Sequence, residues 1–134
     1  MHNNLLTVGL KTQIDIEVVS RHFVGILSTK RLPLHDEKQL QNQIESILLE
    51  AAGKENMQRE YRLDAHNIVD FFINGIGIEI KLKAPKRSIF KQCERYCKFD
   101  SIKNLILVTN TAMGFPAEIN GKSCFVVNLG KAWL

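Results

Sequence analysis

The stretch IVDFFINGIGIEIKLK, from Ile68 to Lys83, decides the expected fold. Asn74–Gly75 at its centre is a strong short-range signal for a two-residue hairpin turn between two strands. Such a turn fixes which residues face each other across the hairpin. The expected pairs are Ile73 with Ile76, Phe72 with Gly77, Phe71 with Ile78, and Asp70 with Glu79.

This register separates apolar from polar side chains, because successive residues of a strand point to opposite faces. One face collects apolar residues that should pack on the core: Val69, Phe71, Ile73, Ile76, Ile78 and Ile80. The other face carries Asp70, Glu79 and Lys81, beside Phe72 and Gly77. A four-residue turn would shift the pairing by two residues and leave the same residues on each face.

The two acidic residues on the polar face should lie close together. Cβ atoms of directly opposed residues are roughly 4.5–5.5 Å apart, so Asp70 and Glu79 would repel each other and one pKa would rise. Lys81 on the same face can offset this repulsion, and a divalent cation can do so better, since carboxylates and a backbone carbonyl are ligands that Mg²⁺ prefers. The alternative is that the triplet is only the solvated side of a half-buried sheet.

The rest of the chain supplies helices and strands around this hairpin. Alternation in TQIDIEVV predicts an N-terminal strand, with FVGIL as its partner, although an amphipathic helix fits the same residues. Residues 36–53 predict a helix with Asp36 as N-cap and Gly53 as its stop. Further elements are expected at 58–63 (strand), 88–99 (helix capped by Ser88), 104–109 (strand) and 124–129 (strand). A helical crossover after the hairpin predicts a mixed sheet.

Composition bounds the class of protein. The 134 residues fit a single domain spanning 1–134, with 45% hydrophobic and 24% charged residues. No apolar run approaches the roughly 18 residues of a membrane span, and the N-terminus lacks the features of a signal peptide, so we expect a cytoplasmic protein. The net charge of +4 mildly favours polyanionic partners.

Cys93, Cys97 and Cys124 are expected to be small buried core residues, with a zinc site as the weaker alternative.

Residues outside the hairpin strengthen a functional interpretation of the polar face. Glu45 lies beside the apolar stripe of the preceding helix, which should pack on this sheet. Gln92 and Tyr96 are four residues apart, so they share one face of the following helix. Basic residues gather after the hairpin at Lys83, Lys86, Arg87, Lys91 and Arg95. The alternative is ordinary helix packing for Gln92 and Tyr96, and an exposed charge on the helix flank for Glu45. The alternative for the basic residues is a solvated face.

The arrangement resembles the PD-(D/E)XK nuclease superfamily. The motif consists of VD at Val69–Asp70, eight intervening residues, and EIK at Glu79–Lys81, with Val69 in place of the family's proline. QCERY at Gln92–Tyr96 is similar to a pattern found in several branches, including VRR-type and recombination-linked nucleases. REYRL and GKSCFVVNLGKAWL look compatible with small stand-alone phage or bacterial members. The resemblance covers residues 36–129, and residues 1–35 form an extension without a counterpart.

The resemblance implies an α/β fold with a restriction-endonuclease-like αβββαβ core, in which helices flank a central mixed sheet. It also implies a Mg²⁺-dependent DNA endonuclease, with Mn²⁺ able to substitute. Asp70 and Glu79 would hold one or two ions together with the carbonyl of Ile80, and Lys81 would position or deprotonate a water or neutralise the phosphate. Glu45 would assist through water, and Gln92 would orient the site or touch DNA.

The resemblance also suggests how DNA would be held. Phosphate contacts are expected from Lys83, Lys86, Arg87, Lys91 and Arg95. Tyr96 would be a further nucleic-acid-binding residue or would orient the site. The chain contains no recognisable sequence-reading module, which favours structure- or end-dependent cleavage, as in DNA repair or recombination. A homodimer is expected because cutting both strands with one site per chain usually needs two chains. Residues 1–35 are a candidate dimerisation element.

Two other functions fit the same residues. The fold could hold nucleic acid or a partner protein without cutting, in which case the basic residues carry the function. Alternatively, the chain is a small structural or inhibitory protein in which the acidic and basic triplet forms only an ion-pair cluster. Metal-dependent cleavage, and its loss on substitution of Asp70 or Lys81, separates these possibilities.

Overall fold

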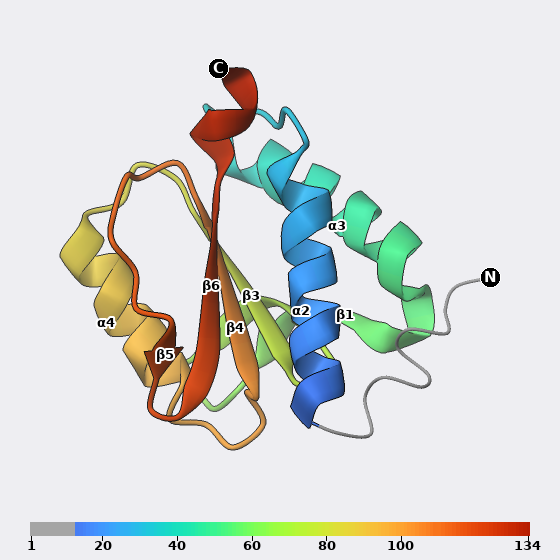
Figure 1. Cartoon of the computed structure of the whole chain (residues 1–134), viewed down its shortest axis with the longest axis vertical. Helices are drawn as coiled ribbons and strands as arrows, with labels where there is room; N and C mark the ends of the chain where they lie inside the picture. The colour runs from blue at the N-terminus through green and yellow to red at the C-terminus, as the bar shows by residue number, and fades with distance from the viewer. Residues whose placement is uncertain (1–12) are drawn as a thin grey trace.

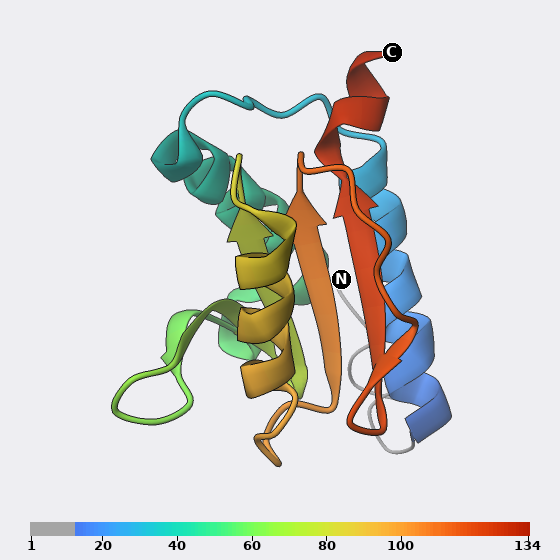
Figure 2. The ribbon, with the colours of Figure 1, turned by 90° about the vertical axis from the view of Figure 1, so that its left-hand side faces the viewer.

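A computed structural model describes residues 13–134, which form a mixed α/β structure with three α-helices around a six-stranded sheet. The sheet order is β1-β2-β3-β4-β6-β5, and α4 lies on the opposite face from α2 and α3 (Figures 1 and 2). The helices are α2 (Gln13–Ser28), α3 (Glu37–Ala52) and α4 (Lys86–Tyr96), with 3₁₀ turns η1 (Lys54–Asn56) and η2 (Leu129–Trp133). The strands are β1 (Met57–Arg62), β2 (Ile68–Ile73), β3 (Ile76–Lys81), β4 (Asn104–Thr109), β5 (Glu118–Ile119) and β6 (Lys122–Asn128).

The N-terminal strands predicted from alternation are wrong over the described residues, where the chain forms helix α2. The amphipathic-helix alternative is the one that the structure adopts. Val19, Phe23 and Leu27, spaced by four residues, are fully buried and make up the helical stripe. Thr12, the first residue of the expected strand, lies outside the described residues, as do residues 1–11. The helix packs on the sheet through Val19, Phe23 and Leu27, which belong to the same core as α3.

Helix α3 confirms its predicted ends. Asp36 Oδ1 accepts a hydrogen bond from the Gln39 backbone N–H over 3.1 Å, as an N-cap should. At the other end Gly53 adopts φ = 90°, and its N–H donates to the Leu49 carbonyl. The buried stripe of the helix consists of Leu40, Ile44, Leu48 and Ala52. This stripe fixes α3 against the sheet face that carries Phe71 and the isoleucines of β3.

The predicted hairpin is confirmed in its turn and in three of its pairs. Asn74 and Gly75 have φ values of 47° and 97°, which suit a tight two-residue turn. The Cα partners are Ile73 with Ile76, Phe72 with Gly77 and Phe71 with Ile78. Five of the six apolar residues expected on one face pack in the core beneath α2 and α3. Val69 is the exception, because it packs in the second core cluster, beneath α4.

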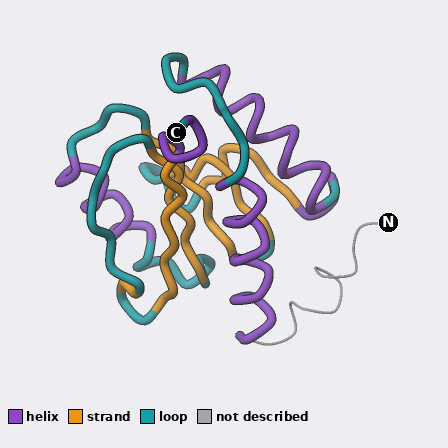
Figure 3. The backbone as a smooth tube through the Cα atoms, turned by 45° about the horizontal axis from the view of Figure 1, so that its top comes forward, coloured by secondary structure: helices purple, strands orange, loops and turns teal. Residues whose placement is uncertain are grey.

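The second half of the sheet confirms the mixed topology. Helix α4 connects β3 to β4, and β4 runs parallel to both β3 and β6, whose arrows point the same way in Figure 2. Figure 3 shows helices on both sides of the strands. All six residues of β4 are buried, which is typical of a strand covered on both faces. Ser88 is not the N-cap of α4, since the helix begins at Lys86 after Pro85, and the Ser88 hydroxyl donates to the Pro85 carbonyl over 3.0 Å. No helix within residues 13–134 combines the length and apolar character that crossing a bilayer requires.

Candidate active site

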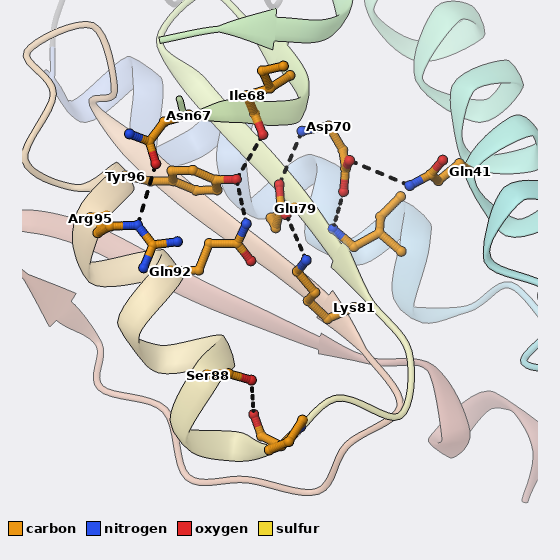
Figure 4. A network of polar contacts seen from close by, with 12 residues as sticks. Gln41, Asn67, Ile68, Asp70, Glu79, Lys81, Ser88, Gln92, Arg95 and Tyr96 are labelled. Carbon is orange, nitrogen blue, oxygen red and sulfur yellow. Dashed lines mark hydrogen bonds and ion pairs between the residues drawn. The ribbon is translucent and has the colours of Figure 1, made fainter. Parts of the chain in front are cut away.

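The ladder between β2 and β3 opens at the two acidic residues. Its last Cα pair is Phe71 with Ile78, and beyond this pair the side chains take over the backbone contacts. The Asp70 N–H donates to Glu79 Oε1 over 3.1 Å, and the Ile80 N–H donates to Asp70 Oδ2 over 2.8 Å (Figure 4). Each carboxylate is therefore held by the backbone of the other strand, and the expected closeness of the two residues is confirmed.

Burial makes this acidic pair difficult to ionise fully. Glu79 is only 2% exposed, and Asp70 is half-buried. Burial, followed by the negative charge of Asp70, raises the pKa of Glu79 to about 8. Burial also raises the pKa of Asp70 to about 6, against the opposing effect of the hydrogen bond from Ile80. Without a bound metal ion, Asp70 and Glu79 together should hold a proton at neutral pH.

Lys81 is the cation nearest to this pair. Its Nζ lies 3.5 Å from Glu79 Oε2, and its side chain is 28% exposed, so the amine connects the buried acid to the surface. Lys81 also lines a cavity of about 320 Å³ against α4. The lining residues are Lys81, Ala84, Ser88, Ile89, Lys91, Gln92 and Arg95. Three of them are cations and none is acidic, which suits an anionic ligand.

Helix α4 contributes Gln92 and Tyr96 to the site from one face, as predicted. Gln92 Nε2 donates to the Tyr96 hydroxyl over 2.8 Å, and that hydroxyl donates to the Ile68 carbonyl over 2.8 Å. Tyr96 is 1% exposed, and burial raises the pKa of its hydroxyl. The ring is enclosed and its hydroxyl anchors β2 two residues before Asp70, which favours a positioning role for Tyr96 over direct contact with nucleic acid. Gln92 is half-buried and lines the cavity.

Helix α3 approaches the acidic pair through a residue that the sequence did not single out. Gln41 Nε2 donates to Asp70 Oδ1 over 3.5 Å. Arg59 of β1 fixes the other end of this amide, because its Nη2 donates to Gln41 Oε1 over 3.4 Å. Glu45, which we expected beside the acidic pair, instead accepts from Arg59 Nη1 over 2.7 Å. Glu45 thus reaches Asp70 through Arg59 and Gln41.

A sequence signal for Gln41 did exist. It precedes Glu45 by four residues, so both belong to the same face of α3. Arg59 lies in the REYRL segment, where its contact with α3 depends on tertiary packing that periodicity does not reveal. The structure therefore adds an amide and a guanidinium to the predicted acidic and basic residues.

The basic residues divide into two groups. All five are exposed: Lys83, Lys86, Arg87, Lys91 and Arg95. Lys91 and Arg95 join Lys81 around the cavity. The other three lie in the connection from β3 and at the start of α4, outside the cavity lining. The structure thus brings two of the five to the cavity that Lys81 lines.

The cysteines take no part in the site. Cys93, Cys97 and Cys124 are all buried, in agreement with the expected core role. The sulfurs of Cys97 and Cys124 lie 3.9 Å apart, between the end of α4 and β6.

The donor atoms at the acidic pair determine which cation would fit. Within residues 15–134, no group of three or more His, Cys, Asp or Glu side chains is arranged to hold a metal ion. Two carboxylates and a backbone carbonyl are nevertheless what Mg²⁺ commonly uses, since it keeps several waters and shares substrate phosphates. The raised pKa values of Asp70 and Glu79 show that this location would favour a compensating positive charge.

The chain matches no family model, no curated protein and no solved structure. The resemblance to the PD-(D/E)XK superfamily stays a prediction, which depends on the residues of the hairpin and of α4. The geometry of the site is independent of that resemblance. It consists of a buried acidic pair, an adjacent amine and a cationic cavity.

Proposed function

We propose that the protein is a Mg²⁺-dependent DNA endonuclease, with a restriction-endonuclease-like core and structure- or end-dependent cleavage. The observation that carries the proposal is the reciprocal bonding of Asp70 and Glu79, with Lys81 Nζ at 3.5 Å from Glu79. Two acids and one amine converge where the β2–β3 ladder opens, beside a cavity lined by cations. This combination suits hydrolysis of a phosphodiester better than it suits a purely structural ion pair.

The residues present fit a divalent ion. Asp70, Glu79 and the Ile80 carbonyl would hold it, and Mn²⁺ would be accepted by the same oxygen ligands. When bound, the ion would supply Lewis-acid stabilisation of the phosphate and a water of lowered pKa. Gln41 and the Ile80 N–H would keep the Asp70 carboxylate in one orientation, since they bind its two oxygens.

The protein's own cations would perform the electrostatic work on the phosphate. Lys81 would place positive charge next to the reacting group, where a preorganised cation stabilises developing negative charge. Lys91 and Arg95 would hold neighbouring phosphates in the cavity, and Lys83, Lys86 and Arg87 would extend this contact along the backbone. Gln92 would orient a phosphate or water from the cavity wall.

The test is a cleavage panel. Branched, single-stranded and duplex DNA are incubated with Mg²⁺, Mn²⁺ or EDTA, and products are followed on denaturing gels. We expect metal-dependent cleavage that is lost in Asp70→Ala and reduced about a hundredfold or more in Lys81→Ala. Lys30→Ala, at an exposed position after α2, is the control and should retain activity. Cleavage in EDTA, or full activity in both site variants, would overturn the proposal.

The panel also tests the binding alternative. Wild-type protein that retains DNA in a salt-dependent manner and never cleaves it would favour a role in holding nucleic acid. For double-strand cutting we further propose a homodimer, because each chain carries one acidic pair. Analytical ultracentrifugation with and without duplex DNA measures this directly.

A further inference from the structure

Strand β1 contains a residue that sends its neighbours to opposite faces of the sheet. Glu60 has φ = 55°, a left-handed conformation that costs free energy in a residue other than glycine. In a regular strand Arg59 and Tyr61 would share a face. Here Arg59 pairs with Glu45 of α3 and lies 5.8 Å from the Phe71 ring centroid, whereas Tyr61 packs with the cluster beneath α4.

The displaced tyrosine forms an aromatic stack. The rings of Tyr61 and Phe72 have centroids 4.0 Å apart and an interplanar angle of 9°. Both residues are half-buried, so part of each remains accessible. Because the two rings are nearly parallel, a third flat ring can extend the stack.

The stack lies on the same side of the sheet as the proposed reaction site. Phe72 is the cross-strand partner of Gly77, and directly opposed residues project to one face. Glu79 and Lys81 follow Gly77 at intervals of two, so they share that face. Tyr61 pairs with Val69, the residue before Asp70. The aromatic pair is thus adjacent in register to both carboxylates.

One cation of the cavity reaches the start of β2, the strand that carries Phe72. Arg95 lines the cavity with Lys81 and Lys91, and its Nε donates to Asn67 Oδ1 over 3.4 Å, just before β2 begins. Proteins that bind single strands combine a cationic groove for the phosphates with aromatic rings for the bases. The cavity supplies the first of these features and the stacked pair supplies the second.

We propose that Tyr61 and Phe72 form a stacking platform for an unpaired base, so that the substrate of this site is DNA with a single-stranded segment. The inference rests on the proposed nucleic-acid function and narrows it to one substrate class. Bases inside a duplex are already stacked on their neighbours and cannot occupy the platform. The phosphates of the same strand would enter the cavity beside Lys81.

Binding, measured apart from cleavage, tests the platform. Fluorescence anisotropy follows a labelled oligothymidine of about 12 nucleotides with Ca²⁺ in place of Mg²⁺, and gels verify that the DNA stays intact. Leucine preserves apolar bulk and removes the ring, so Tyr61→Leu and Phe72→Leu should each weaken binding by about fivefold or more. Phe125→Leu removes another half-buried ring, next to Arg21 of α2, and should bind as the wild type does.

Abasic oligonucleotides provide an arm that does not depend on folding of the variants. Wild-type protein should bind a fully abasic strand at least fivefold more weakly than the oligothymidine. In Tyr61→Leu the affinities for these two strands should be closer to each other. Equal affinity of wild-type protein for the thymidine and abasic strands would overturn the platform. So would tighter binding of a blunt duplex of the same length than of the single strand. Base-dependent binding without cleavage would instead overturn the nuclease proposal alone.

Discussion

Glu79 accepts a hydrogen bond from the Asp70 backbone N–H, and so its carboxylate occupies the position where the β2–β3 ladder would otherwise continue. The ionisable groups are thereby part of the sheet itself rather than appended to its surface. Rotation of either side chain would leave a backbone N–H without a partner, which costs free energy when the group is buried. This coupling makes the site rigid and makes the stability of the fold sensitive to its charge.

Stability of the metal-free protein should fall as the pH rises from about 4 to about 8. Burial raises the pKa of Asp70 from 3.8 to about 6 and that of Glu79 from 4.5 to about 8, so over this range the folded state binds more protons than the unfolded state. Such a difference lowers the free energy of unfolding with increasing pH. Urea titrations in EDTA at pH 5, 7 and 9 measure the trend. Glu79→Gln should flatten it, whereas Glu118→Gln, at an exposed position, should not.

Divalent metal should counteract the loss of stability at high pH. Ions bind the ionised carboxylates, so Mg²⁺ or Mn²⁺ should raise the melting temperature more at pH 8 than at pH 5. Differential scanning fluorimetry with a metal titration measures the shift. Asp70→Asn should abolish it, and an equal shift in this variant would place the bound ion elsewhere on the protein.

Removal of Gln41 should impair catalysis more than DNA binding. The amide fixes one oxygen of Asp70 and is itself held by Arg59, and loss of such supporting contacts typically costs about 10–100-fold. Gln41→Ala should therefore lower kcat with little change in KM. Arg59→Lys should act in the same direction, since an ammonium group cannot bridge Gln41 and Glu45 as the planar guanidinium does. Gln43→Ala, at an exposed position of the same helix, is the control.

Tyr96→Phe should destabilise the protein without weakening its hold on DNA. The hydroxyl donates to the Ile68 carbonyl and accepts from Gln92, so its removal deletes two part-buried hydrogen bonds at a cost of about 1 kcal/mol each. Chemical denaturation measures this loss. A selective fall in DNA affinity, with unchanged stability, would instead support the contact originally expected for this residue.

The elements that the sequence predicted well are those with local signals. The Asn74–Gly75 turn, the Asp36 cap and the apolar run Leu105–Val108 of β4 each depend on nearby residues, and the structure contains all three. Helix α2 was mistaken for strands because Ile14, Ile16 and Val18 alternate while Val19, Phe23 and Leu27 follow a helical stripe. β5 has only two residues, too few to show any periodicity.

In the site, too, the residues with a local sequence signal were predictable and those that depend on tertiary contacts were not. Asp70, Glu79 and Lys81 were predictable, because hairpin register places them together. Arg59 was not, since its contacts join β1 to α3 across the fold. The spacing of Gln41 and Glu45 places both on one helix face, but it does not show that Gln41 binds Asp70. The enclosure of Tyr96 also depends on tertiary packing, because a helix-face argument identifies its neighbours without showing how deeply α4 buries them.

The left-handed residue in β1 has one more consequence, for association of the protein with itself. β1 is an outer strand of the sheet, and outer strands with regular backbones can recruit a strand from another molecule. The kink at Glu60 interrupts the regular row of amide and carbonyl groups that such recruitment needs. This border of the sheet is therefore protected against edge-to-edge aggregation, and a continuous intermolecular sheet would have to grow from the border formed by β5 and β6.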